Sequence, residues 1–252
     1  MGSVSAMIAG FMLVLTRTGA LVVSAPVLGI GTGFVGYRIT LIGFLSLLLY
    51  STGGGPVQAE PLELALMALR ETVIGVFFGL LVHLALLVVR TAGELVGQEM
   101  GFLVARQVDP NTGVGSSLVT GLYENLFLLF LLALDGHHWL LRSLARSFQY
   151  APIGRLEIGE KLAPTAVAMF SEMFRAGLVF AAPVLVFLML VSAVIGILAR
   201  AVPSMNVMEI GFTLRILVAL GAIFLFAPLL DPALRNLDQQ LLSWLDRGLA
   251  AL

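Results

Sequence analysis

Long stretches without a single charged side chain recur along the whole of this 252-residue chain. A helix needs about 20 mostly apolar residues to cross the hydrocarbon core of a bilayer. Eight charge-free stretches, some near that length and some shorter, are found at 1–16, 18–37, 39–59, 72–89, 110–123, 125–134, 176–199 and 216–230. Because 59% of the residues are hydrophobic and only 12% are charged, such a chain would aggregate in water unless lipid or other subunits covered it. The sequence therefore predicts an all-α membrane protein or membrane-assembly subunit. It excludes a soluble enzyme, a disordered chain and a nucleic-acid binder.

These apolar stretches are interrupted in ways that simple membrane spans are not. The stretch 18–37 contains Pro26 and five glycines, and a Ser-Thr-Gly-Gly-Gly-Pro breaker occupies 51–56. Glu124 and Arg215 each lie inside an otherwise apolar run. Backbone that faces lipid must satisfy its own hydrogen bonds, so irregular segments must be buried in protein or line a cavity. We expect five to seven apolar segments that form kinked helices and hairpins inside a larger assembly, although secondary transporters also use broken helices.

Charge and cysteine content narrow the class further. The net charge is −1, which indicates neither an acidic nor a basic partner, and the absence of cysteine excludes disulfides and thiolate metal sites. The first basic residue is Arg17, so the positive region that precedes the apolar run of a signal peptide is missing. We expect the first segment to remain in the mature protein. The more polar stretch 135–161 is expected to be wet.

Two segments are amphipathic at helical spacing. In 139–149 the expected apolar face is Trp139, Leu140, Leu144 and Phe148, opposite Arg142, Ser143, Arg146 and Ser147. In 234–252 it is Leu234, Leu237, Leu241, Trp244, Leu245, Gly248, Leu249 and Leu252, opposite Arg235, Asp238, Gln239, Asp246 and Arg247. The pair Asp231-Pro232 predicts a helix start. Each segment fits a helix that packs on a core or lies at an interface, and the second also fits a docking helix for a partner.

Two glycine ridges and one irregular loop are the candidates for a conduit. Gly93, Gly97 and Gly101 follow one another at four-residue spacing, which on a helix leaves a smooth ridge for another backbone; Gly75 and Gly79 form a shorter ridge. Ordinary helix packing explains the glycines, whereas the interspersed Glu94, Gln98 and Glu99 fit the lining of a wet channel. The loop 107–117 fits a surface linker on spacing alone, and a gate if it stands at a pore mouth.

The motifs that would carry covalent or metal chemistry are better explained by structure. The G-x-G-x-x-G match at 31–36 lacks the soluble βαβ context that a dinucleotide site needs. Adjacent His137 and His138 would point about 100° apart on a helix, so we expect no metal site. Ser116 and Ser117 have no base near them in sequence, which argues against an intramembrane protease. Glu124, Arg175 and Arg215 are candidates for structural ion pairs or a charge path.

Five colinear segments resemble a known family. They are Gly-Glu-Leu-Val-Gly-Gln-Glu-Met-Gly at 93–101, Asp-Pro-Asn-Thr-Gly at 109–113, Leu-Asp-Gly-His-His-Trp-Leu-Leu at 134–141, Ala-Pro-Ile-Gly at 151–154 and the apolar block 180–212. In order and spacing they resemble the FliR/SctT family of type III secretion export proteins, and more closely its flagellar branch than its injectisome branch. The chain departs from the family pattern at Ser192, Thr213 and Arg215. These departures affect the expected local packing.

The resemblance implies a non-enzymatic subunit of the flagellar type III export gate, without cofactor or metal. Such a subunit would form a pore with FliP and FliQ homologues, contact FlhB and FlhA, and be bounded by membrane lipid. It would pass unfolded flagellar proteins, including rod components, across the bacterial cytoplasmic membrane at the flagellar basal body, and nucleate axial assembly. The alternatives are the injectisome counterpart SctT in virulence secretion and an autonomous secondary transporter.

The resemblance also implies domains and site residues. Residues 1–160 would be FliP-like and 161–252 a FliQ-like helical hairpin. The pore plug would comprise Gln107, Val108, Asp109, Pro110, Asn111, Thr112 and Gly113. The subunit-packing residues would be Gly93, Gly97, Gly101, Pro183, Pro203, Met205 and Asn206.

Overall fold

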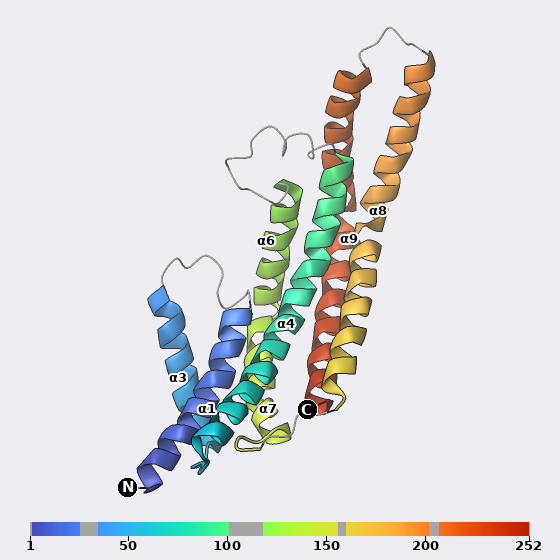
Figure 1. Cartoon of the computed structure of the whole chain (residues 1–252). Helices are drawn as coiled ribbons and strands as arrows, with labels where there is room; N and C mark the ends of the chain where they lie inside the picture. The colour runs from blue at the N-terminus through green and yellow to red at the C-terminus, as the bar shows by residue number, and fades with distance from the viewer. Residues whose placement is uncertain (1, 26–34, 101–117, 156–159, 202–206, 252) are drawn as a thin grey trace. The chain divides into compact units, whose positions relative to one another are not determined.

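A computed structural model describes residues 2–25, 35–100, 118–155, 160–201 and 207–251, and every regular element in these ranges is an α-helix (Figure 1). The helices are α1 (Gly2–Ser24), α3 (Val35–Gly53), α4 (Pro61–Glu99), α6 (Leu118–Ala133), α7 (Gly136–Tyr150), α8 (Leu162–Ala201) and α9 (Val207–Ala250). This confirms the predicted all-α class.

Three helices are long and apolar enough to cross a membrane among the residues that the structure describes. They are Val4–Ser24, Pro61–Glu99 and Leu162–Ala201, and the bent pair α6 and α7 would count as a fourth. A shorter apolar helix, Thr213–Leu225, lies within α9. This count covers the described residues alone, so the five to seven apolar segments expected from sequence stay a prediction. The three long helices support the predicted membrane protein.

The longest helices exceed the thickness of a bilayer. Helices α4, α8 and α9 contain 39, 40 and 44 residues. At about 1.5 Å per residue each is ~60 Å long, twice the ~30 Å hydrocarbon core. Part of each helix therefore lies outside the hydrocarbon core or is strongly tilted. Pro183 in α8 removes one backbone hydrogen bond and is a site for a kink.

Helix α9 runs through the position where the sequence predicted a helix start. Pro228 and Pro232 both lie inside α9, so the Asp231-Pro232 prediction was wrong. Asp231 instead accepts a 3.0 Å hydrogen bond from Arg235 Nε one turn later on the exposed side of the same helix. The helix tolerates each proline at the loss of one ladder hydrogen bond.

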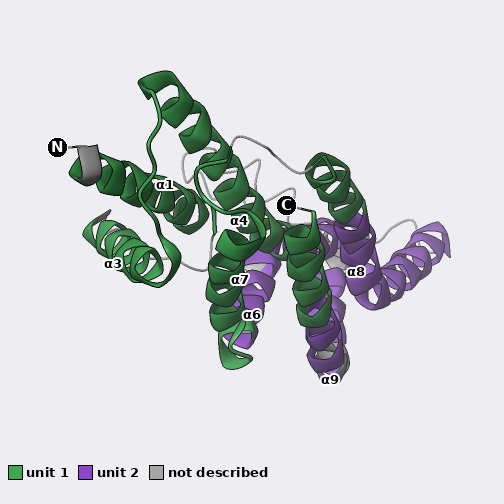
Figure 2. Cartoon of the chain, turned by 90° about the horizontal axis from the view of Figure 1, so that it is seen from below, with its two compact units in different colours: residues 1–85, 131–171, 238–252 green, residues 86–130, 172–237 purple. Residues whose placement is uncertain are grey.

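The chain divides into two compact units (Figure 2). Unit 1 comprises residues 1–85, 131–171 and 238–252, and unit 2 comprises 86–130 and 172–237. Both units combine chain from before and after residue 160, and the predicted division into 1–160 and 161–252 stays a prediction. Each unit is described by itself below.

In unit 1, α1 packs against α3 and α4. Phe11 and Tyr50 meet edge to face with ring centroids 5.8 Å apart at the contact of α1 with α3. On α4, a Cβ added at Gly75 would collide with the backbone of Arg17, and one added at Gly79 with Ser24. The shorter glycine ridge therefore lets the α1 backbone approach α4, as close helix packing predicts.

The end of α9 belongs to unit 1 and confirms the predicted apolar stripe. Its buried positions are Leu241, Trp244, Leu245, Gly248 and Leu249. A Cβ at Gly248 would meet the ring of Phe77 on α4. Asp238, assigned to the polar face from sequence, is 9% exposed and thus also buried.

Helix α7 buries Leu140 and Leu144 of the predicted apolar stripe but differs from the prediction at other positions. Its buried residues are Gly136, Leu140, Ser143, Leu144 and Ser147, whereas Trp139 is 38% exposed. The assignment of Ser143 and Ser147 to the solvent face was wrong. Ser147 is buried because its hydroxyl has a charged partner on α1, as described below.

Unit 2 joins parts of α4, α6, α8 and α9. Tyr123 of α6 and Phe180 of α8 meet edge to face at 6.0 Å, and Gly177 of α8 lies against the backbone of Val88 on α4. Gly211 of α9 brings the helix within contact distance of Ile195 on α8. In the most apolar 18-residue segment of α8 only 22% is buried, compared with 67% in the corresponding segment of α4.

Candidate functional site

A buried cluster of three charged side chains lies in unit 1. Arg17 of α1 donates from Nε to Glu71 Oε2 on α4 at 2.5 Å, and Arg70 donates from Nη1 to Glu71 Oε1 at 2.9 Å. The side chains of Arg17 and Glu71 are 0% exposed and that of Arg70 is 5% exposed. Both oxygens of this one carboxylate are thus engaged by buried guanidinium groups.

Arg17 extends this cluster to α7. Its Nη1 donates to Ser147 Oγ at 3.1 Å, and its Nη2 donates to the carbonyl oxygen of Ala151 at 2.8 Å. Its guanidinium also lies 4.2 Å from the centre of the Phe148 ring. The planar fork of arginine suits such a multiple contact, because it presents its donors in fixed directions.

Arg70 completes the arrangement by donating to the carbonyl oxygen of Pro152 at 3.1 Å. Residues 151–152 directly follow α7. The two arginines therefore form hydrogen bonds both with α7 and with the backbone after its C-terminal end. The cluster therefore joins three helices that are far apart in sequence. Because its contacts are ion pairs and hydrogen bonds between helices, it acts as a structural clamp.

This clamp is not predicted from the sequence. Arg17 stands out only as the first basic residue, and no motif marks Arg70 or Glu71. The available signal was that charges interrupt apolar helices at 17 and at 70–71. Charges in such places are normally paired.

Glu124, which the sequence proposed for an ion pair, has one within unit 2. Arg90 Nε of α4 lies 2.5 Å from Glu124 Oε1 of α6, and the two side chains are 47% and 20% exposed. The predicted structural pairing of Glu124 is therefore confirmed, although it is only partly buried. Arg215 differs, since its Nε is buried and has no hydrogen-bond partner among the described residues.

The predicted glycine ridge of α4 is buried where the structure describes it. A Cβ at Gly93 would collide with the backbone of Thr120 on α6, and Gly97 is buried as well. Gly93 thus admits a helix of its own chain, and its role in packing between subunits stays a prediction. Pro183 lies exposed on α8.

The remaining predicted site residues lie outside the described residues. They are the plug residues Gln107 to Gly113, together with Gly101, Pro203, Met205 and Asn206. Most of the glycine motif at 31–36 and the serines at 116–117 lie outside them too.

A small cavity in unit 1 is lined by two residues that each carry a buried polar atom. It has a volume of about 10 Å³, room for one water molecule, and among its lining residues are His137 of α7 and Asp238 of α9. His137 Nδ1 and Asp238 Oδ1 are both buried and have no hydrogen-bond partner among the described residues. Burial raises the pKa of Asp238 above its ordinary value.

Comparison with known proteins places the chain in a family. Residues 8–241 match the model of the bacterial export proteins, family 1. The flagellar biosynthetic protein FliR of Bacillus subtilis (strain 168) is 32% identical over 240 residues, which covers 94% of this chain and 93% of that protein.

Two further relatives carry the same name. FliR of Escherichia coli (strain K12) is 29% identical over 179 residues, covering 71% of this chain and 69% of that protein. FliR of Caulobacter vibrioides (strain ATCC 19089 / CIP 103742 / CB 15) is 26% identical over 218 residues, covering 84% and 86%. The matched region includes the clamp of Arg17, Arg70 and Glu71 and the glycine ridge of α4. The chain therefore belongs to family 1 of the bacterial export proteins, the family of the flagellar biosynthetic protein FliR.

Proposed function

We propose that this protein is a core subunit of the flagellar type III export gate in the bacterial cytoplasmic membrane. The observation that carries the proposal is the match of residues 8–241 to the export family, with relatives named for flagellar biosynthesis on nearly the full length of the chain. Those flagellar names favour the flagellar gate over the injectisome. The family match also counts against the secondary transporter.

The distribution of apolar surface supports a subunit within an assembly. The side chains of Val179, Met189 and Ile197 on α8 are 67%, 63% and 69% exposed. A helix with this much uncovered apolar surface must be covered by lipid or by other subunits. In the proposed gate, homologues of FliP and FliQ and the membrane lipid share that role.

The proposed gate works without covalent chemistry. Residues 1–160 would act as the FliP-like part and 161–252 as the FliQ-like hairpin, so that the chain closes a ring of related helical hairpins around a pore. Unfolded flagellar proteins and rod components would pass through the pore at the basal body, with FlhB on the assembly and FlhA below it. The clamp of Arg17, Glu71 and Arg70 would hold α1, α4 and α7 of the subunit together during passage.

Co-purification tests the assembly. The chain is co-expressed with the FliP and FliQ homologues of the same bacterium and isolated through a tag on the chain. Both homologues should co-elute in a complex of fixed composition, whereas an unrelated membrane protein expressed at the same level should not. Failure of the tagged chain to recover either homologue would contradict the proposal.

The plug assignment has its own test. Deletion of 108–114 should leave the assembled complex intact and make it conduct ions or small solutes in a planar bilayer. The undeleted complex, purified in parallel, serves as the closed reference. Equal conductance of the two complexes would remove the plug role from this loop.

A further inference from the structure

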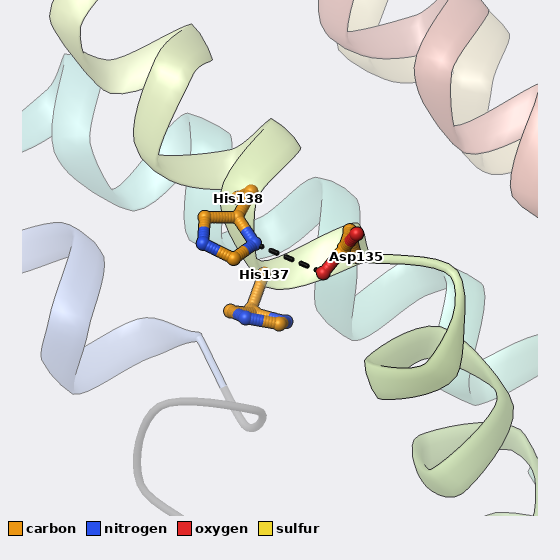
Figure 3. A group of neighbouring side chains, drawn as sticks. All are labelled: Asp135, His137 and His138. Atoms are coloured by element: carbon orange, nitrogen blue, oxygen red, sulfur yellow. Dashed lines mark hydrogen bonds and ion pairs between the residues drawn. The ribbon is translucent and has the colours of Figure 1, made fainter.

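Three side chains that can ligate a metal come together where α6 ends and α7 begins. Asp135 lies in the break between the helices, and His137 and His138 follow in the first turn of α7 (Figure 3). One ligand atom of each side chain lies within 4.8 Å of the others. Among the described residues this group is distinct from the buried clamp, since it shares no residue with it.

The two imidazoles lie together although they are neighbours in sequence. Successive side chains on a helix point about 100° apart, which was the argument against a metal site. In the structure the ring centroids are only 4.1 Å apart and the rings are tilted by 41°. Asp135 has a left-handed backbone with φ of 60°, and its carboxylate reaches the same place as the rings (Figure 3).

The spacing of the ligand atoms suits a first-row transition metal. With bonds of about 2.0–2.2 Å to nitrogen and oxygen, a tetrahedral ion holds its ligand atoms ~3.3 Å apart. His138 Nδ1 and Asp135 Oδ1 are already 3.1 Å apart. Because the ligand atom of His137 lies within 4.8 Å of the other two, it needs to move by no more than about 1.5 Å, which a side-chain rotation provides.

His137 also has a ring nitrogen that lacks a protein partner. Its Nδ1 is shielded from water and has no hydrogen-bond partner among the described residues. His138, in contrast, has Asp135 as a partner. Rotation of the His137 ring onto an ion therefore breaks no hydrogen bond of Nδ1 with the described chain, and this lowers the energetic cost of ligation.

We propose that Asp135, His137 and His138 bind one divalent transition-metal ion of the Zn²⁺ class, with water in the fourth position. Imidazole nitrogen selects such ions over Mg²⁺ and Ca²⁺, which prefer oxygen. The positive end of α7 and the nearby Arg142, whose guanidinium lies over the Trp139 ring, oppose a cation and keep the affinity moderate. The bound ion would fix the first turn of α7 to the left-handed residue before it. This inference does not rest on the proposed function.

The chain contains few other side chains that bind transition metals through imidazole nitrogen or thiolate sulfur. There is no cysteine, and His83 on α4 is the third and last histidine. His83 is exposed and takes no part in the group, so His83→Ala is the matched control. The full chain is purified with an affinity tag that contains no histidine and is treated with a chelator before titration.

Co²⁺ titration followed by visible absorption, with Zn²⁺ displacing Co²⁺, measures the site. The parent and His83→Ala should bind one ion per chain with equal affinity. His137→Ala and His138→Ala should each bind at least about tenfold more weakly, because each loses one of three protein ligands. Circular dichroism should show the same helix content for all four proteins. Absence of saturable binding to the parent, or undiminished binding by both His137→Ala and His138→Ala, would overturn the proposal.

Discussion

Glu71→Gln is the most direct test of the buried clamp. The substitution keeps the shape of the side chain but removes the charge that two buried guanidinium groups share. Arg17 is 0% exposed and Arg70 is 4% exposed, so neither cation can turn to water without disrupting the packing. We expect a large loss of stability, because an uncompensated charge would remain in the interior.

The size of the loss follows from burial. Removing one partner of a buried ion pair costs about 3–5 kcal/mol, and the amide oxygen that still accepts a hydrogen bond places Glu71→Gln near the lower end. A change of 1 kcal/mol shifts Tm by roughly 2–4 °C in a chain of this size, so Tm should fall by about 6–12 °C. Glu124→Gln is the matched control, since its partner Arg90 is 47% exposed and a pair of that kind contributes at most about 1 kcal/mol.

Thermal unfolding of the purified chain in detergent, followed by circular dichroism, measures both variants. Adding Arg17→Met to Glu71→Gln removes the fully buried cation that Glu71 pairs with and should recover part of the lost Tm. Equal shifts for Glu71→Gln and Glu124→Gln would refute the view that burial of the clamp, rather than pairing as such, determines its contribution.

Three further changes probe other contacts. Gly75→Leu should lower stability by about 1–3 kcal/mol because its side chain would meet the backbone of α1. Gly43→Leu is the control and should change Tm little, because a Cβ added at Gly43 meets open space. Equal effects of the two substitutions would contradict the close approach of α1 to α4. Ser147→Ala removes the acceptor of a hydrogen bond from buried Arg17 and should lower the free energy of unfolding by about 1.5–3 kcal/mol, as measured by chemical denaturation. An unchanged free energy of unfolding would show that this hydrogen bond does not stabilise the fold. Because the folded pKa of Asp238 is raised, the folded state favours its neutral form, and stability should fall as pH rises from the ordinary carboxyl value through the raised one. Asp238→Asn should flatten the plot of Tm against pH over this pH range, measured in a buffer that contains a chelator. The same pH dependence of Tm in Asp238→Asn and the parent would contradict the role of Asp238.

Much of the architecture was predictable from residue types. Charge-free apolar runs at this composition leave helices in lipid or in an assembly as the solution, and the described part of the chain contains three helices long and apolar enough to span a membrane. The stripe of Leu241, Trp244, Leu245 and Leu249 was also predictable, because a repeat of three and four residues places these side chains on one face of any helix. The family could likewise be recognised from the motif series, and the comparisons confirmed it.

Burial predicted from residue type was wrong where a partner far away in sequence stabilises a polar side chain in the interior. Ser147 belongs to the polar face by its type, yet it is buried because Arg17 of α1, 130 residues away in the chain, donates to its hydroxyl. Asp238 is buried although no described partner satisfies its Oδ1. Pro232 reads as a helix boundary locally, but α9 continues through it.

The sequence by itself determined the helical class, the membrane setting, the family and the apolar face of the C-terminal helix, because composition and short-range periodicity act within a single helix. Only the tertiary structure decided that Arg17, Glu71 and Ser147 form one buried clamp, and that α4 admits α1 at Gly75. These outcomes depend on which surfaces meet. A charge or a small side chain acquires its role from a partner that the local sequence does not specify.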